Sequence, residues 1–568
     1  MVVEALSSDT AHLGLVGVVA LVALAVVHTL DRPAGAWGRQ LRSRFVLGVP
    51  WGTLVAIGFV VVVYLFVQDG ITNPNRPVVI PFRAWSYFYP EGVLWSGFAH
   101  SSRSHITGNL LSTLVAGTLA EYAYGHYPRG RGTTTFRSLR TNPYARAFLV
   151  VPGAILTFGF VSSLFALGPV IGFSGVVFAL WGFALVHYPI GTIAALTGST
   201  LVSVVHSTIQ RPVEFAEASA SYGAPSWANI AVQGHALGLI TGILVAVWVV
   251  RRRRRAGDRN APYVAAIVGF GAVLLFGSSR RLWAVYWYLG NDQYELYRAV
   301  GLALLVLLAL IVAVAVAGRE EPFRPAAAVP NPETVRGSVA SATPAAVGLL
   351  LLVMALGVVA GPGVLPNLVT VDTGDAPGDP IEVEGYQVTY AENVDDRMVN
   401  VIDVEAFGRT TSVRTSGVIV SNPDREIWTT VVSRGNLAFW GYRAVDVGGT
   451  GWRETVWVQR TGWVAAGGDP TYRIDGVYNG TRSTLFVGDP VDAEPQLDGR
   501  TVAVAATEGG FELRVTHEET TESAQLPSDE ASVTVQGVEF VREERRLYAE
   551  RGDSRVRVAT QERYEGRE

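Results

Sequence analysis

Neither cysteine nor lysine occurs among the 568 residues of this sequence. Without cysteine, the chain can form no disulfide framework, no thiolate nucleophile and no cysteine-based metal site. All 45 basic residues are therefore arginine, and charged residues together make up only 17% of the chain. Hydrophobic residues make up 49% and the mean hydropathy is +0.29. This composition is too apolar for a soluble protein and is typical of a polytopic membrane protein.

Long hydrophobic runs, by contrast, are abundant. A transmembrane helix needs roughly 20 mostly apolar residues, and ten stretches qualify as candidates. They lie near 12–30, 46–67, 104–124, 147–167, 173–189, 190–209, 229–250, 262–278, 298–317 and 345–366. Pro189 and Gly191 predict a tight turn between the fifth and sixth. The first stretch lacks a charged segment before it and a small-residue cleavage site soon after it, so we interpret it as a span rather than a signal peptide.

Arginine clusters predict the orientation, because short cytoplasmic loops carry an excess of basic residues. Clusters follow the first, third, seventh and ninth stretches, and these loops can all be cytoplasmic at once. Ten crossings then put both termini outside, with Arg280 and Arg281 as a mild exception on an outer loop. The clusters are Arg32, Arg39, Arg42 and Arg44; Arg129, Arg131, Arg137, Arg140 and Arg146; Arg251 to Arg255; and Arg319, Arg324 and Arg336.

The composition changes at about residue 372, where acidic residues become frequent and apolar runs long enough to span a membrane end. Thr455–Val458, Thr484–Val487 and Ser532–Gln536 favour strands, with Gly, Asp, Asn and Pro between them. We therefore expect 372–568 to be an acidic, mostly β, extracytoplasmic domain. Asn479-Gly480-Thr481 fits the acceptor pattern for N-glycosylation, which also occurs often by chance. Five tryptophans in this domain favour a β core over a binding face: Trp428, Trp440, Trp452, Trp457 and Trp463.

Four polar residues lie within the apolar stretches: His105, Asn109, Ser174 and His235. Polar and ionisable groups are costly in hydrocarbon, so those that occur there usually face a polar cavity and carry function. A hydroxyl, two imidazoles and an amide are the groups used in nucleophilic acyl transfer. Each residue alone has a plainer interpretation, because intramembrane histidine and asparagine often only join helices by hydrogen bonds.

The spacing of these four residues, and the glycines beside them, gives further information about their positions in the fold. His105 and Asn109 are four residues apart and share one helix face, and His100 lies one turn earlier. Gly172 and Gly175 flank Ser174 and allow a sharp turn before a helix, although a serine at a helix start is more commonly an N-cap. His235 adjoins a stripe of small residues that favours close helix packing: Gly234, Gly238 and Gly242.

Together the three motifs resemble the rhomboid family of intramembrane serine proteases. The family pattern is H-x4-H-x3-N on the second core helix, G-x-S-G opening the fourth, and G-H-x2-G-x3-G on the sixth. This chain has the three motifs in that order, and Gly117, Glu121 and Gly125 are similar to the G-x3-E-x3-G ending of the second helix. The matching residues are His100, His105 and Asn109; Gly172, Ser174 and Gly175; and Gly234, His235, Gly238 and Gly242. The resemblance covers about residues 46–250.

The resemblance implies a serine endopeptidase with a Ser–His dyad that cleaves transmembrane segments of other proteins. Ser174 would be the nucleophile and His235 the general base and then acid. His105, Asn109 and the Ser174 backbone N–H would stabilise the oxyanion. No cofactor, metal or nucleic acid is expected; the partners would be transmembrane protein substrates and the lipid bilayer, and the oligomeric state stays open.

Two positions depart from the family pattern. The loop before the second core helix usually carries Trp-Arg, whereas here Glu91–Ser96 contains Trp95 with no arginine beside it. Many members have a tyrosine four residues after the serine that stacks on the catalytic histidine. Here that residue is Phe178, which keeps the ring and loses the hydroxyl.

The expected fold is an all-α polytopic membrane bundle with a C-terminal, mostly β domain. It comprises an extra N-terminal helix (1–45), a rhomboid-like six-helix core (46–255), three further spans (256–371) and the β domain (372–568), in the plasma membrane. Two other functions stay open: a catalytically inactive, rhomboid-like scaffold that binds transmembrane helices, and a receptor or transporter with the β domain as sensor. The remaining histidines show no metal-ligand spacing: His12, His28, His126, His187, His206 and His517.

Overall fold

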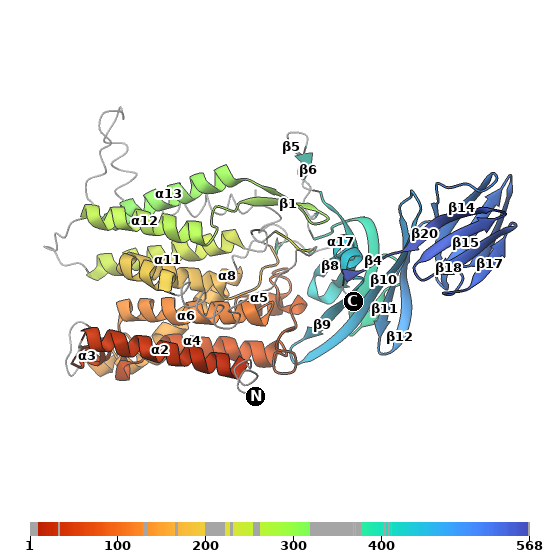
Figure 1. Cartoon of the computed structure of the whole chain (residues 1–568). Helices are drawn as coiled ribbons and strands as arrows, with labels where there is room; N and C mark the ends of the chain where they lie inside the picture. Colours follow the sequence, from red (N-terminus) through yellow and green to blue (C-terminus); the bar gives the residue numbers. More distant parts are fainter. Residues whose placement is uncertain are drawn as a thin grey trace, which may run out of the picture.

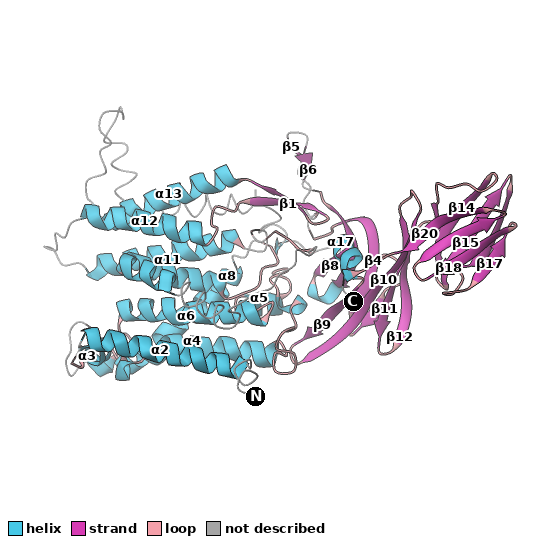
Figure 2. Cartoon of the chain, viewed as in Figure 1, coloured by secondary structure: helices cyan, strands magenta, loops and turns pink. Residues whose placement is uncertain are grey.

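The chain forms a helical bundle and a β region that follow one another along the long axis of the molecule (Figure 1). The computed structural model describes residues 9–31, 34–128, 135–164, 168–198, 222–225, 227, 231–253, 262–317, 367–368, 370, 376–398, 400, 405–406, 409–410 and 412–565. Helices gather in the first part and strands in the second (Figure 2). This segregation follows the composition, in which long apolar runs end before the β region begins.

Helices occupy nine of the ten predicted spans in the described part of the chain. The tenth, 345–366, lies outside the described residues. The helices are α2 (Asp9–Asp31), α4 (Trp51–Val62) continued by a π-helical turn (Val63–Val67), α6 (Arg103–Tyr124), α8 (Val151–Leu164) preceded by α7 (Pro143–Ala145) and a π-helical turn (Arg146–Val150), α9 (Ser174–His187), a helix at Pro189–Gly198, α11 (Val232–Arg253), α12 (Pro262–Ser279) and α13 (Arg298–Ala317). Short helices α3 (Ala36–Arg44) and α5 (Pro90–Ser96) lie between them.

The predicted turn between the fifth and sixth spans lies slightly earlier than expected. Tyr188 alone interrupts the helices, with φ −139° and ψ 65°, and Pro189 begins the next helix. Proline suits the first position of a helix because its missing N–H would have no intrahelical acceptor there. The sequence analysis also did not predict the two-stranded hairpin that precedes α13, formed by β1 (Tyr286–Gly290) and β2 (Gln293–Leu296).

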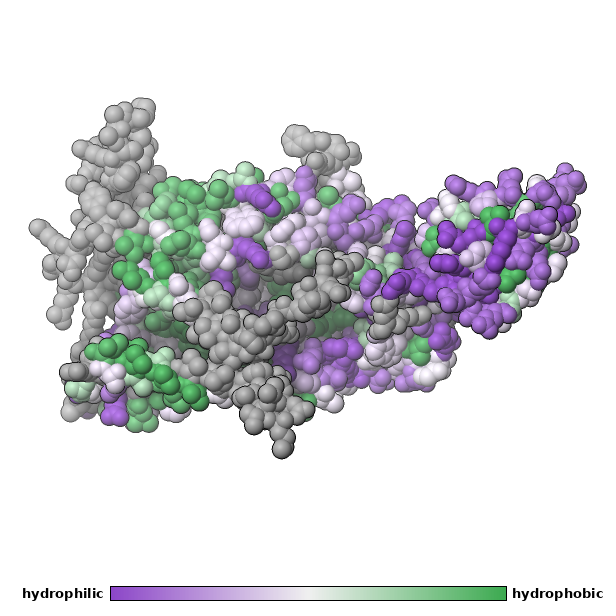
Figure 3. Space-filling model, viewed as in Figure 1, coloured by the Kyte–Doolittle hydropathy of each residue, from purple (hydrophilic) through white to green (hydrophobic). Residues whose placement is uncertain are grey.

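The outer surface of the bundle is apolar. Among the described residues, one helix (Pro143–Leu164) is long and apolar enough by itself to cross a membrane, and seven shorter apolar helices accompany it. Leucines on several helices are largely exposed, among them Leu21, Leu111, Leu149 and Leu275. In the space-filling view, hydrophobic residues gather over the bundle and hydrophilic residues over the β region (Figure 3). Exposed apolar surface of this extent marks a site of interaction, and on a helical bundle it fits contact with lipid.

Helices α9 and α11 pack so closely that only glycine fits between them. A Cβ atom on Gly238 would lie 2.2 Å from the Gly175 carbonyl oxygen, and one on Gly242 would lie 1.9 Å from that of Ala179. On the facing helix, a Cβ on Gly182 would lie 2.3 Å from the Leu239 oxygen. The small-residue stripe predicted at Gly238 and Gly242 is therefore the contact surface between these helices.

Glu121 joins the end of α6 to the start of α4. Its carboxylate accepts hydrogen bonds from the Gly52 N–H (2.9 Å), the Thr53 N–H (2.8 Å) and the Thr53 hydroxyl (2.7 Å). His126 Nε2 lies 2.6 Å from Glu121 Oε1, and the Val46 N–H donates to His126 Nδ1. Because Nδ1 accepts a hydrogen bond here, the ring proton is on Nε2, which donates to Glu121. A buried carboxylate with this many donors is well compensated; Gly117, against which Thr53 packs, leaves the room for it.

The β region contains two hydrophobic cores. The first lies between a sheet of order β3-β4-β7-β8 and strands β9 to β12, and the second between the sheet β13-β14-β15-β16 and strands β17 to β20. β10 belongs to both, since it pairs with β9, β11 and β20. The strands are β3 (Ile381–Val383), β4 (Tyr386–Asp395), β7 (Arg414–Asn422), β8 (Ile427–Ser433), β9 (Tyr442–Gly449), β10 (Trp452–Ala465), β11 (Pro470–Tyr478), β12 (Thr481–Val487), β13 (Val491–Asp492), β14 (Arg500–Thr507), β15 (Gly510–His517), β16 (Thr520–Gln525), β17 (Ser532–Val535), β18 (Val538–Glu543), β19 (Arg546–Arg551) and β20 (Ser554–Gln561), with helix α17 (Arg434–Trp440) and the small pair β5 (Glu405–Ala406) and β6 (Arg409–Thr410).

The three strand segments expected from the sequence lie in β10, β12 and β17. The tryptophans share no single face: Trp428 is buried in the first core and Trp463 in the second, while Trp457 is 45% exposed. Asn479 and Gly480, both with positive φ, form the turn between β11 and β12. Asn-Gly is the pair that such a hairpin turn favours, so folding accounts for this dipeptide, and glycosylation of Asn479 stays a prediction.

We predict that replacing Gly242 with alanine destabilises the bundle by about 1–3 kcal/mol, the usual cost of overpacking a tight core. The added methyl would meet the backbone of Ala179, which cannot rotate away. The matched control is Gly153→Ala on α8, where a Cβ has nothing within 4 Å. Thermal unfolding of the purified protein in detergent measures both. Equal midpoints for the two variants would contradict the packing described here.

Candidate active site

Ser174 is the first residue of α9, at the end of the bundle that faces the β region. Gly172 precedes it with φ +128°, and a Cβ there would lie 2.8 Å from His105 Cε1 and 3.8 Å from Ser174 Oγ. Only glycine tolerates both this backbone conformation and this contact. The first N–H groups of a helix have no intrahelical acceptor, so the Ser174 and Gly175 N–H groups are suited to bind a negative charge next to the hydroxyl.

His235, near the start of α11, lies within hydrogen-bonding distance of Ser174. Its Nε2 is 2.8 Å from Ser174 Oγ, and the Phe178 ring stacks on the imidazole with centroids 4.1 Å apart and planes 9° from parallel. Phe178 in turn contacts Phe276 of α12 edge-on. In the described part of the chain His235 Nδ1 has no hydrogen-bond partner. The arrangement is therefore a serine–histidine pair oriented by an aromatic ring, without a third, carboxylate member.

His105 lies beside the serine, whereas Asn109 is bonded elsewhere. The His105 ring borders Gly172, and its Nδ1 lies 3.0 Å from the Ser101 hydroxyl. Asn109 is 9% exposed and its Nδ2 lies 3.0 Å from His100 Nε2. An amide nitrogen donates, so His100 accepts this bond and leaves one Asn109 N–H for another acceptor. An oxyanion role for either residue stays a prediction.

Two buried amides that the sequence analysis missed hold the surrounding loops. Gln68 accepts the His100 N–H (2.7 Å) and donates to the carbonyl oxygens of His100 and Val78 (2.8 Å each). Asn367 donates to the Ala84 oxygen (2.6 Å) and accepts the Gly168 N–H (3.2 Å). Gln68 follows a predicted span directly, and a polar residue at that border was the available signal. Asn367 lies 199 residues from Gly168, and no feature of the sequence indicated this contact.

The other motif residues serve contacts between helices. Gly117 and Glu121 join α6 to α4, and Gly238 and Gly242 form the contact between α9 and α11. Gly234 is loosely surrounded, since the nearest atom to a Cβ there is 4.0 Å away. Among the described residues, no group of three His, Asp or Glu side chains is arranged to hold a metal ion.

The apolar bundle and its serine–histidine pair define a polytopic helical membrane protein with a candidate nucleophile inside the helical region. Comparison with protein families gives the same class: residues 87–252 match the family described as Rhomboid domain. The match covers less than half of the chain, so what it shows is a Rhomboid domain within this protein. The match begins after α4, which the Glu121 bonds nevertheless join to it. No curated protein and no solved structure matches the chain.

We predict that Phe178→Ala lowers the rate at which a fluorophosphonate probe labels Ser174 by about tenfold. A buried aromatic contact contributes roughly 0.5–1.5 kcal/mol, and its loss lets the imidazole turn away from the hydroxyl. Phe183→Ala is the matched control, because Phe183 stacks on His187 of the same helix at 4.5 Å. Labelling lowered equally by both substitutions would contradict a specific role for Phe178.

Proposed function

We propose that this protein is an intramembrane serine endopeptidase that cleaves transmembrane segments of other membrane proteins. The observation that carries the proposal is the 2.8 Å contact between Ser174 Oγ and His235 Nε2 at the start of α9. A nucleophile within hydrogen-bonding distance of a base, beside free N–H groups of a helix, has the parts that acyl transfer requires. The match of residues 87–252 to the Rhomboid domain supports it, because most proteins of that family are serine proteases.

The chemistry proceeds in two halves. Ser174 Oγ attacks the scissile carbonyl while His235 Nε2 takes its proton, and the carbonyl oxygen becomes an oxyanion. The Ser174 and Gly175 N–H groups, His105 and the remaining Asn109 N–H are the donors available to it. His235 then gives the proton to the leaving amine, and the carbonyl remains on Ser174 as an ester. A water molecule, deprotonated by His235, hydrolyses the ester and regenerates the hydroxyl.

In this proposal the serine opens toward the extracytoplasmic side of the plasma membrane, where the β region also lies. The arginine-rich segments support this orientation, because they follow the helix ends away from Ser174 and favour the cytoplasm. Substrates would be cut near the outer ends of their transmembrane segments. Neither a metal nor another cofactor takes part in the proposed steps.

The second candidate is a catalytically inactive rhomboid-like scaffold that binds transmembrane helices. The Asn109 amide favours it, because one of its N–H groups is already bonded to His100. Against it stands the retention of both Ser174 and His235 at bonding distance, since a scaffold has no need of an oriented nucleophile.

We predict that Ser174→Ala abolishes release of the soluble fragment from a tagged single-span reporter in proteoliposomes, with a loss of at least about 1,000-fold. His235→Ala should cause a similar loss, because the two residues act as a unit. Ser203→Ala, a serine of the same chain outside all the motifs, serves as the control. Equal cleavage by the wild type and Ser174→Ala would rule out the serine mechanism.

Labelling by a fluorophosphonate probe separates the two candidates without any substrate. A protease should show label that disappears in Ser174→Ala, whereas a scaffold should show none that depends on this serine. Label without cleavage of any reporter would indicate an intact nucleophile and a reporter that the enzyme does not accept.

A further inference from the structure

The first lobe of the β region is the part built around its first hydrophobic core, from strands β3, β4 and β7 to β12. It is held against the loop that joins α4 to α6. Arg76 of this loop bonds both carboxylate oxygens of Asp446 on β9 (2.9 and 2.7 Å), and Arg453 on β10 reaches the same carboxylate. Apolar loop residues Ile80, Trp85 and Tyr89 belong to the same hydrophobic core as β4, β7 and β9. Because ion pairs and a shared core act together, the position of the lobe over the bundle is fixed by packing.

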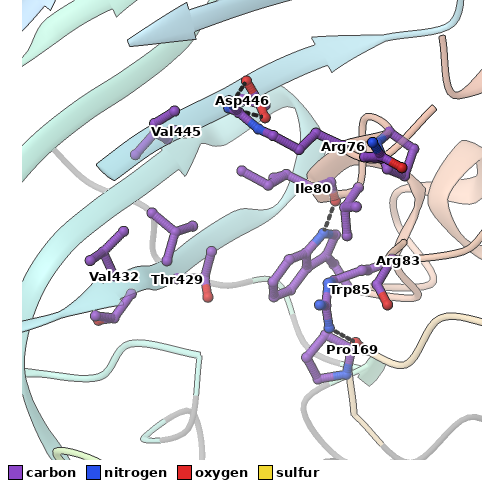
Figure 4. A pocket seen from close by; sticks show the side chains of 16 residues that line it. Arg76, Ile80, Arg83, Trp85, Pro169, Thr429, Val432, Val445 and Asp446 are labelled. Atoms are coloured by element: carbon purple, nitrogen blue, oxygen red, sulfur yellow. Dashed lines mark hydrogen bonds and ion pairs between the residues drawn. The ribbon is translucent and has the colours of Figure 1, made fainter. Parts of the chain in front are cut away.

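A cavity of about 460 Å³ lies between this loop and the lobe. Arg83, Ser101 and Pro169 line it on the bundle side, and Thr429–Val432 of β8 and Ala444–Asp446 of β9 line it on the other. Figure 4 shows Thr429, Val432 and Val445 facing Ile80 and Trp85 across it. A second cavity, of about 330 Å³, shares Thr430–Val432 and Ala444 and continues to Tyr288 and Asp292 of the hairpin. The size of each suits a bound ligand.

Both strands along this path are sheet edges. β8 ends its sheet and pairs only with β7, and β9 pairs only with β10, among the described strands. Val431 is the extra residue at a bulge, because Val418 opposes Val432 and Ile419 opposes Thr430. An exposed edge offers unpaired N–H and C=O groups to an added strand. Thr429–Val432 extend over about 13 Å at 3.3 Å per residue, which matches about four residues of an extended peptide.

The path leads to the candidate nucleophile. Ser101, on the cavity wall, contacts His105 Nδ1 at 3.0 Å, and His105 borders Gly172, two residues before Ser174. Pro169, also on the wall, lies in the segment that leads into α9. An extended chain that pairs with β8 would therefore reach the wall formed by Ser101 and Pro169, and Ser101 contacts the His105 ring that borders Gly172.

The charge in the cavity is unbalanced. Arg76 and Arg453 share the single carboxylate of Asp446, whereas the Arg83 guanidinium donates to the Pro169 carbonyl oxygen (3.0 Å) and forms no ion pair with an acid in the described part of the chain. Desolvation lowers the pKa of Arg83, and no acidic neighbour offsets it. Arg83 is half-buried, and a cation that has lost part of its hydration is normally paired, so a carboxylate on the ligand would complete the site.

We propose that the edges of β8 and β9 bind an extended segment of the substrate, adjacent to its transmembrane helix, with an acidic side chain at Arg83. This rests on the proposed function, since it names the part of the substrate that the β region recognises. Val431, Val432, Ile80 and Trp85 provide apolar surface for neighbouring side chains of the same segment. The β region thereby selects which membrane proteins reach Ser174.

The absence of cysteine allows a direct test by disulfide cross-linking. Ala444→Cys is combined with Ser174→Ala in the full-length protein, reconstituted with single-span reporters that each carry one cysteine in the flanking segment. We expect cross-links at alternate reporter positions, because successive residues of a strand face opposite ways. Ser483→Cys on β12, another edge strand, is the control and should form none. No cross-link at Ala444→Cys, or equal cross-linking at both sites, would overturn the proposal.

Cross-linking requires no catalysis, so its result is independent of the proposed function. Cross-links at Ala444→Cys together with a wild-type protein that cleaves no reporter would keep the docking site and overturn the protease. Cleavage that depends on Ser174, with no cross-link, would do the reverse.

The acidic contact is tested with charge exchange. Replacing a reporter aspartate in the flanking segment with asparagine should lower kcat/KM about tenfold, and Arg83→Gln should do the same. The two changes combined should lower kcat/KM no further than either alone, because each removes the same pair between Arg83 and the reporter aspartate. Arg83→Glu with arginine in the reporter should restore cleavage, which a purely structural arginine would not permit. Additive losses, or an Arg83→Gln effect seen only in vesicles containing phosphatidylglycerol and not in phosphatidylcholine alone, would overturn the acidic peptide in favour of a lipid phosphate.

Discussion

The close approach of α9 and α11 is the constraint on which the site depends. Cβ atoms on Gly238 and Gly242 would collide with carbonyl oxygens of α9 at 2.2 and 1.9 Å, so no other residue permits this separation. The hydrophobic effect does not drive helices together in lipid, and dispersion between closely fitted backbones does so instead. The same contact brings His235 of one helix to Ser174 of the other, and Phe178 then fixes the ring. Close packing of the bundle and the pairing of Ser174 with His235 therefore share one cause.

The β region shares a hydrophobic core with the loop between α4 and α6. Its first core includes Ile80, Trp85 and Tyr89 from the loop between α4 and α6, and Arg425 donates to the Tyr89 hydroxyl at 2.6 Å. This loop is also where the chain departs from the family pattern, with Trp95 lacking a neighbouring arginine. Arg83 and Trp85 lie in the loop instead and contact Pro169 and Ile80. A loop that must hold an added domain has different packing partners, which accounts for a different sequence there.

Much of the helical part could be predicted from the sequence, because apolar runs of membrane length admit few other structures. The pairing of Ser174 with His235 could be anticipated too, since glycine spacing marks where helices meet. Asn367 could not be assigned, because hydrogen bonds to loop backbones leave no periodicity, whereas Gln68 was marked only by its position at the border of a predicted span. The partner of Asn109 was also beyond prediction. His105 lies on the same face of α6, whereas His100 lies in the loop before this helix, and its contact with the amide depends on how that loop is held.

The sequence by itself determined the class of protein, the order of its two parts and the residues of the candidate site, because hydropathy and glycine spacing are local properties of the chain. Only the tertiary structure decided that β8 and β9 end as open edges above Ser101 and Arg83. Strand pairing joins segments far apart in the sequence, and a strand is an edge strand only when no other segment pairs with its second side. Whether the charge of Arg83 is hydrated or balanced by an acid likewise depends on its neighbours in the folded chain, which the sequence does not reveal.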